Sequence, residues 1–191
     1  MTKKVFELLL NEDAEGVFAI SLVDRPATKS NWNWIAFSET QKIEFKEVAG
    51  NRNLLMGAVL IPDLLIDRRG EDGEVFQVFL SAETIQKTAY KFMKDGNQGE
   101  STLQHKTKVD GVTVVETWLK EDMVHDKSVK YGFDYPLNTW MVAIIVENDD
   151  IKAKVKSGEI KGFSIEGFFN QKQKMSEDEI AYNKIKELLT N

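Results

Sequence analysis

The stretch STLQHKTKVDGVTVVETWL, residues 101–119, carries the strongest local folding signal in the chain. Asp110 and Gly111 stand between two β-prone runs, and Asp-Gly in that setting predicts a two-residue hairpin turn. With these two residues as the loop, the pairing places His105 directly opposite Glu116. Directly opposed side chains share one face of a sheet, with Cβ atoms about 5 Å apart.

A carboxylate beside an imidazole has a specific chemical use. A general-base histidine needs an acceptor on its far nitrogen, which fixes the tautomer and stabilises the imidazolium. The predicted hairpin gives Glu116 that place beside His105. The same pairing also fits an ordinary polar pair on a solvated face, and a three-residue loop would separate the two residues. The second histidine, His125, lies in a polar segment and is expected at the surface, and the spacing of the two histidines predicts no metal site.

Short β-like runs on both sides of this hairpin predict a mainly β protein. The expected strands are residues 5–10, 16–23, 32–37, 42–48, 54–61 and 74–80. Three helices are expected at residues 81–94, 150–157 and 176–189, the first capped by Ser81 and the last by the box Ser176-x-x-Glu179. Many short strands with few helices predict an α+β fold, namely a mainly antiparallel, closed or nearly closed β-barrel with helices packed outside.

Composition narrows the class of protein. The chain has 191 residues, of which 42% are hydrophobic and 29% charged, which fits one globular domain with a real core. It lacks cysteine, which excludes disulfides, thiolate metal sites and cysteine nucleophiles. The net charge of −6 argues against a general nucleic-acid binder and favours protein partners. The polar residues directly after Met1–Leu10 argue against a secretory signal, and a soluble cytoplasmic protein without a membrane span is expected.

The sequence GEIKGFSIEGFF, residues 158–169, contains the second candidate site residue. Ser164 is the one small hydroxyl among strand-forming residues, and Gly162 and Gly167 remove side chains close to it. A nucleophilic serine needs an adjacent base and room for a substrate carbonyl. The pattern differs from the Gly-x-Ser-x-Gly elbow of the α/β-hydrolases, because the second glycine comes one position late. It also fits an ordinary strand serine near a bulge glycine.

Two glutamates compete for the role of the catalytic acid. Glu166 lies two positions after Ser164 and therefore shares its face of the strand. An anion beside the nucleophile would hinder attack, so Glu116 is the preferred acid, and Glu166 stays the alternative.

Five segments in this order resemble the prohead serine proteases of tailed phages, especially the phage serine protease family of PBSX-type prophages. They are Gly16–Ala27 (GVFAISLVDRPA), Gly57–Pro62 (GAVLIP), His105 with Val114–Trp118 (VVETW), Gly132 with Asn138–Trp140 (NTW), and Lys161–Gly167 (KGFSIEG). The resemblance spans roughly residues 16 to 169, with Asn138 standing where the family usually has glycine.

The resemblance implies a herpesvirus-assemblin-like fold and a serine endopeptidase that cleaves scaffold and major capsid proteins inside the assembling procapsid, in the host cytoplasm. Ser164 corresponds to the nucleophile and His105 to the base. Herpesvirus relatives place a second histidine after the serine, and none follows here, so an acid is expected in the third role and Glu116 is assigned to it.

The expected organisation is a protease domain at residues 1–170 followed by an amphipathic helix at 171–191. No cofactor, nucleic-acid or membrane partner is expected. The C-terminal helix could dock on the barrel, mediate self-association into a homo-oligomer or tether the enzyme to scaffold. The alternatives are a catalytically inactive capsid-assembly or scaffold-core protein with the same fold, or a peptide-binding module.

Overall fold

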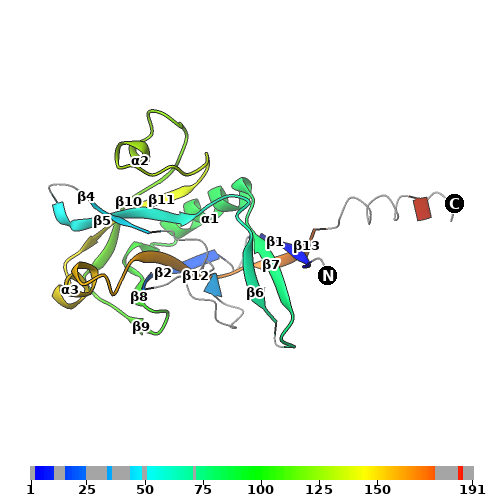
Figure 1. Cartoon of the computed structure of the whole chain (residues 1–191), viewed down its shortest axis with the longest axis horizontal. Coiled ribbons are helices and arrows are strands. Elements are labelled where there is room, and N and C mark those ends of the chain that lie inside the picture. Colours follow the sequence, from blue (N-terminus) through cyan, green and yellow to red (C-terminus); the bar gives the residue numbers. More distant parts are fainter. Residues whose placement is uncertain are drawn as a thin grey trace.

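The protein is built mainly of β-strands (Figure 1). The computed structural model describes residues 3–10, 16–24, 34–35, 44–48, 51–70, 72–174 and 185–186. Across these residues, none of the helices combines the length and apolar character needed to span a membrane.

The described strands form three sheets. Sheet A has the order β13-β1-β7-β6 and contains β1 (Val5–Leu9), β6 (Ile66–Arg69), β7 (Val75–Phe79) and β13 (Asn170–Gln173). Sheet B has the order β3-β12-β2-β8-β9 and contains β2 (Gly16–Val23), β3 (Trp34–Ile35), β8 (Ser101–Leu103), β9 (Thr107–Lys108) and β12 (Gly162–Phe168). Sheet C has the order β10-β11-β5-β4 and contains β4 (Lys46–Val48), β5 (Asn51–Leu60), β10 (Val112–Leu119) and β11 (Trp140–Val146).

The predicted α+β fold with a closed, assemblin-like barrel is wrong. The protein is mostly β with few helices, and none of its three sheets closes. Closure requires the two outer strands of a sheet to pair, whereas β13 and β6 stand at opposite edges of sheet A. The pairing is also not purely antiparallel, because β1 runs parallel to β7, and β2 runs parallel to β8.

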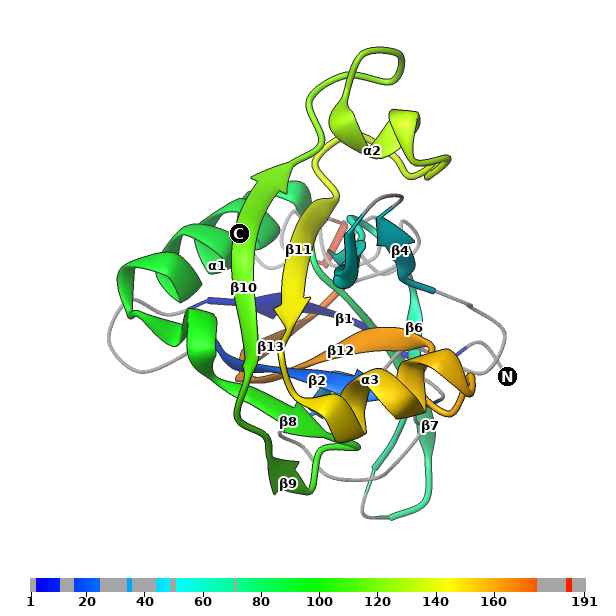
Figure 2. The same ribbon diagram turned by 90° about the vertical axis from the view of Figure 1, so that its left-hand side faces the viewer.

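The core lies mainly between sheets B and C. Phe163 on β12 packs against Phe45, with ring centroids 5.2 Å apart, and a Cβ atom at Gly57 on β5 would lie 3.2 Å from the Phe163 ring. Strand β11 (WMVAIIV) is buried along almost its whole length. Strands β10 and β11 run roughly across the direction of β2 and β12 (Figure 2). Sheets B and C therefore pack in the orthogonal rather than the aligned arrangement.

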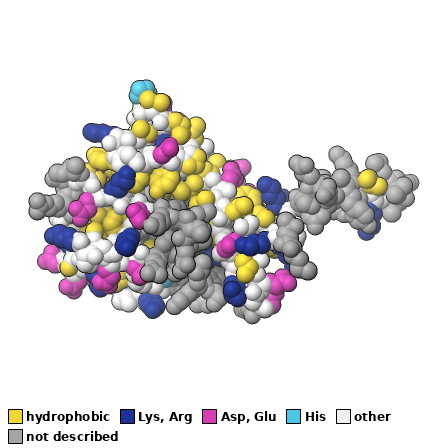
Figure 3. All heavy atoms as spheres, in the orientation of Figure 1, with side chains coloured by type: hydrophobic (Ala, Val, Ile, Leu, Met, Phe, Trp, Pro, Cys, Tyr) yellow, Lys and Arg dark blue, Asp and Glu magenta, His cyan; other side chains and the backbone are white. Residues whose placement is uncertain are grey.

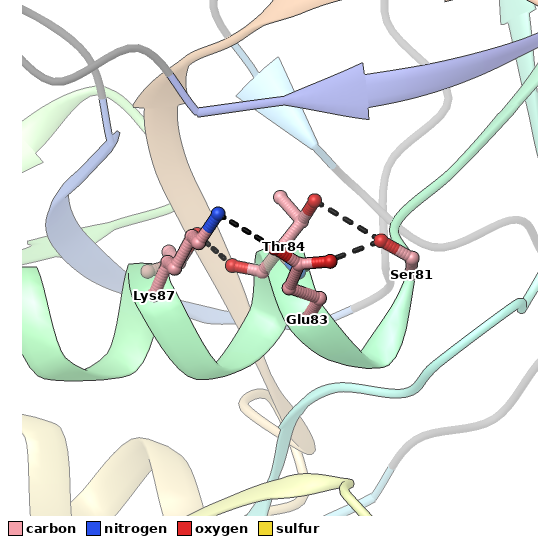
Figure 4. A network of polar contacts seen from close by, with 5 residues as sticks. Ser81, Glu83, Thr84 and Lys87 are labelled. Carbon is pink, nitrogen blue, oxygen red and sulfur yellow. Dashed lines mark hydrogen bonds and ion pairs between the residues drawn. The ribbon is translucent and has the colours of Figure 1, made fainter.

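Helix α1 (Ala82–Lys94) confirms the helix predicted at residues 81–94. The Ser81 hydroxyl accepts a hydrogen bond from the backbone N–H of Thr84 at 3.4 Å, which caps the first turn (Figure 4). Lys87 and Glu83 form an ion pair of 2.7 Å on the outer side of the helix. On its inner side Phe92 contacts Trp140 of β11, with ring centroids 5.5 Å apart. The helix therefore covers part of sheet C.

The other helices are short. The 3-10 helix η1 (Asn97–Gly99) follows α1. Helix α3 (Asp149–Lys156), with Asn148 as its N-cap, confirms the helix predicted at 150–157. Of the helix predicted at 176–189, only residues 185–186 belong to the described residues, and these two are helical.

Residues 120–139 form a lobe at the end of the β10–β11 pair, and we call it the α2 lobe after helix α2 (Lys127–Lys130) (Figure 1). The Asn138 N–H donates to the carbonyl of Lys120 at 2.8 Å and closes the base of the lobe. Hydrophobic side chains gather on and below this part of the surface (Figure 3). The exposed ones in the lobe include Met123, Val124 and Leu137.

Candidate active site

Ser164 lies in the middle of β12, one of the inner strands of sheet B. Its neighbours Phe163 and Ile165 belong to the hydrophobic core, so Ser164 and Glu166 point to the opposite face of the sheet. We call this opposite face the site face. Ser164 is fully buried and Glu166 is 7% exposed.

A row of hydroxyl side chains crosses the site face beside Ser164. Ser21 on β2 stands directly opposite Ser164, and Thr102 on β8 stands directly opposite Ser21. The Ser21 hydroxyl donates to the backbone carbonyl of Thr102 at 3.4 Å. Three neighbouring strands therefore place one small hydroxyl each side by side.

His105 enters this row from the turn that follows β8. Its backbone N–H donates to the Ser21 hydroxyl at 2.9 Å. Gln104 and His105 both have left-handed backbone conformations, with φ values of 53° and 54°. Such conformations are costly for residues other than glycine and are often retained at functional sites. The bond to Ser21 helps to hold the turn in this conformation.

The imidazole of His105 meets the carboxylate of Glu166. The His105 Nδ1 atom lies 3.3 Å from Glu166 Oε1, and each of the two side chains is 9% exposed. The Thr102 hydroxyl donates to the same Oε1 atom. Glu166 is therefore held between a histidine and a threonine on the site face.

The arrangement has the parts of a serine–histidine–acid site. In such a site the acid binds one ring nitrogen of the histidine, so that the other nitrogen can take the proton of the serine. Glu166 contacts Nδ1, so Nε2 is the ring nitrogen that remains to take the serine proton. Ser164 and Glu166 are two residues apart on one strand, which corresponds to about 6.6 Å between their Cα atoms. This is a distance that an imidazole can bridge.

Glu116 lies elsewhere. The predicted hairpin is wrong, because Thr107 pairs back with Leu103 of β8, and β10 pairs with β11. Glu116 stands opposite Ala143 in sheet C and forms an ion pair with Lys127 of the α2 lobe. The structure thus brings His105 and Ser164 to one face of sheet B and leaves Glu116 on a different sheet.

The Asp110-Gly111 turn has another use. Gly111 adopts a φ of 71°, and its carbonyl accepts from the backbone N–H of Glu147 at 2.7 Å and of Asn148 at 3.3 Å. The turn therefore carries the chain from sheet B into sheet C and packs against the end of β11. A sharp turn was predicted at the right residues, but the strands that it joins belong to different sheets.

The sequence reasoning missed Ser21 and Thr102. Ser21 is the one hydroxyl in the apolar strand GVFAISLV, the same signal that singled out Ser164. Glu166 was recognised as sharing the face of Ser164 but was ranked second. The described residues contain no group of three histidine or acidic side chains that could hold a metal ion. His125 lies in the α2 lobe, where its backbone N–H donates to Asp122 at 2.7 Å.

A buried serine, an imidazole and a carboxylate on one face of a β-sheet define a candidate serine-hydrolase site. The sequence model of the family described as "Putative phage serine protease XkdF" matches residues 42–173, and the chain belongs to this family. The matched range contains His105, Ser164 and Glu166, whereas Ser21 precedes it.

A relative from Bacillus subtilis (strain 168), "Uncharacterized protein YqbD", is 28% identical over 156 residues, covering 78% of this chain and 43% of the relative. The chain therefore spans less than half the length of that relative. No solved structure matches the chain.

Proposed function

We propose that this chain is a serine endopeptidase that cleaves scaffold and major capsid proteins during procapsid maturation, in the host cytoplasm. The observation that carries the proposal is the 3.3 Å contact between His105 Nδ1 and Glu166 Oε1 on the face that bears Ser164. Membership of a phage serine protease family supports the same chemistry and the same viral setting.

The proposed reaction is acyl transfer. His105 takes the proton of the Ser164 hydroxyl while the serine oxygen attacks a peptide carbonyl carbon. The protonated His105 then gives that proton to the departing amine, and the acyl group stays on Ser164. Water, deprotonated by His105, releases the acyl group as a carboxylate and regenerates the serine. Glu166 holds Nδ1–H throughout and stabilises the imidazolium.

The burial of Ser164 sets a condition for this reaction. Its exposed fraction is 0%, so a substrate carbonyl reaches the hydroxyl only after the site face has opened.

The test is co-expression of the full chain with the scaffold and major capsid proteins of its own phage or prophage, followed by mass spectrometry of the products. Ser164→Ala removes the nucleophile and is expected to lower processing by roughly 10⁶-fold, which is below detection. Ser157→Ala is the matched control, because Ser157 closes α3 with a bond to the Lys154 carbonyl and lies outside the site. Normal processing by Ser164→Ala would exclude this serine as the nucleophile.

The second candidate function is an inactive capsid-assembly or scaffold-core protein, and the full burial of Ser164 favours it. A serine-reactive phosphonate separates the two candidates, because it labels only an activated and reachable hydroxyl. Labelling of the wild type that disappears in Ser164→Ala supports the peptidase. A wild type that stays unlabelled and unprocessing under assembly conditions supports the inactive protein.

A further inference from the structure

The site face ends in a pair of exposed aromatic rings. Phe18 on β2 and Phe168 on β12 have ring centroids 5.5 Å apart and are 40% and 44% exposed. Each is the one exposed residue of its strand, since the remaining residues of β2 and of β12 are buried. Two exposed aromatic rings in contact with each other, next to a buried polar cluster, are a candidate contact surface.

The strand geometry places both rings on the same face as the catalytic candidates. Ser164, Glu166 and Phe168 alternate along β12, so they share one face. On β2, Ala19 pairs with Glu166 and Val17 pairs with Gly167, which leaves Phe18 as the extra residue of a β-bulge. A bulge re-aims a side chain.

The packing of its neighbours fixes the direction in which Phe18 points. Val17, Ile20 and Leu22 belong to the hydrophobic core, whereas Phe18 and Ala19 do not. The bulge therefore keeps Val17 inward and turns Phe18 outward, beside Phe168. Gly167 permits the close approach of the two strands at this point, because a Cβ atom there would lie 2.6 Å from the Gly16 carbonyl oxygen.

We propose that Phe18 and Phe168 form a substrate subsite that binds an apolar side chain of the extended polypeptide to be cleaved. The inference rests on the proposed peptidase function. Phe168 follows Ser164 by four residues on one strand, a separation of about 13 Å. An extended substrate lying along the site face covers this distance with about four residues, so the subsite recognises the side chain about four positions from the cleaved bond.

The chemistry of the occupant follows from the rings. Two tilted phenyl rings without a polar atom bind an aliphatic or aromatic side chain favourably, because the contact removes apolar surface from water. They provide no hydrogen bond or opposite charge for a charged side chain. Their position on paired strands of sheet B fixes the spacing from Ser164. After the site face has opened, a substrate polypeptide has to lie over it to reach Ser164, so such a chain is the occupant that the arrangement fits.

The test uses the full chain and a library of short unstructured peptides, with the cleaved bonds identified by mass spectrometry. The wild type is expected to prefer an apolar residue about four positions from the cleaved bond. Phe18→Gln and Phe168→Gln are expected to remove that preference and to lower kcat/KM for apolar-bearing peptides roughly tenfold, through KM. Phe18→Leu and Phe168→Leu keep an apolar surface and are expected to keep the preference. Tyr90→Gln is the matched control, since Tyr90 is a 57% exposed aromatic residue on α1.

The outcomes separate the subsite from the peptidase function. An unchanged preference in both glutamine variants, or an equal loss in Tyr90→Gln, overturns the subsite while the enzyme stands. A wild-type dimer that dissociates in Phe168→Gln without a change of preference assigns the rings to self-association and also overturns it. If the wild type neither cleaves the library nor reacts with a serine-directed phosphonate, the peptidase function fails and the subsite falls with it.

Discussion

The site face of sheet B and the α2 lobe both bury charged or titratable groups, but they treat them differently. On the site face, Glu166 contacts His105 and accepts from Thr102, and Ser21 accepts from the His105 backbone. In the α2 lobe, Lys120 has an exposed fraction of 0%, and its ammonium nitrogen has no hydrogen-bond partner within the described part of the chain.

The difference shows which buried polar groups act together. A buried charge without a partner costs several kcal/mol, whereas a connected set of hydrogen bonds holds each of its members in one geometry. Asp126, an acidic residue of the lobe, accepts hydrogen bonds from the indole N–H of Trp118 at 3.2 Å and from the backbone N–H of Ser128 at 2.8 Å. These bonds hold the backbone and Trp118 of the lobe in place and do not involve Lys120. The site face therefore holds its polar groups in one connected hydrogen-bond network, whereas the lobe buries a lysine nitrogen that has no hydrogen-bond partner among the described residues.

The largest expected effect separates the two glutamates. Glu166→Gln keeps the shape of the side chain but removes the charge that orients His105, and it is expected to lower kcat by roughly 10⁴-fold with little change in KM. Glu116→Gln is the matched control, because Glu116 is paired with Lys127 at the surface of another sheet. It is expected to leave kcat within about twofold and to change stability by about 1 kcal/mol or less.

The rate of Ser164 labelling by a phosphonate and the processing of co-expressed capsid protein both report this effect. A normal rate in Glu166→Gln together with a large loss in Glu116→Gln would return the acid role to Glu116. That outcome would also require β10 to leave β11, its partner in sheet C.

The next effect concerns the lobe. Lys120→Met replaces a buried ammonium by an apolar group of similar length and is expected to raise the free energy of unfolding by about 1 to 4 kcal/mol. Chemical denaturation of the two proteins measures this difference, and peptidase activity is expected to stay at the wild-type level. Lys152→Met is the control, because Lys152 forms an ion pair with the 94% exposed Asp149 carboxylate, and it is expected to change stability by about 1 kcal/mol or less. Destabilisation by Lys120→Met would mean that the ammonium has a stabilising partner after all.

The sequence predicted most elements of the fold but not their pairing. Strand β2 and helix α1 were predicted almost to the residue, because each has a clear pattern and a clear end. Strand β11 was not predicted, since it is buried on both faces and lacks the alternation of a half-buried strand. Strand β10 pairs with this long apolar strand and not with β9, the short polar strand on the other side of the Asp-Gly turn. A local turn signal does not reveal such a distant competitor.

The candidate site was predicted in part for the same reason. Ser164 and His105 were found from short motifs that resemble a known family, and the structure places both on the site face. The choice between Glu116 and Glu166 depended on the hairpin register, which long-range pairing overrides. Ser21 looked like one serine in an apolar strand, and only the pairing of β2 with β8 and β12 reveals its place beside His105.

The smallest effect tests whether Ser21 positions His105. Ser21→Ala leaves the His105 N–H without its acceptor and frees a turn of two left-handed residues, so kcat is expected to fall about tenfold at an unchanged KM. Stability is expected to fall by about 1 to 3 kcal/mol, because a buried donor loses its partner. Ser101→Ala is the matched control: its hydroxyl is buried and bonds to the Val112 carbonyl at 3.2 Å, on the next strand and away from the site face. An equal loss of stability in both variants with a loss of kcat in Ser21→Ala alone identifies a positioning residue. Equal kcat in both would reduce Ser21 to a structural hydroxyl and would leave Glu166 as the side chain that orients the imidazole.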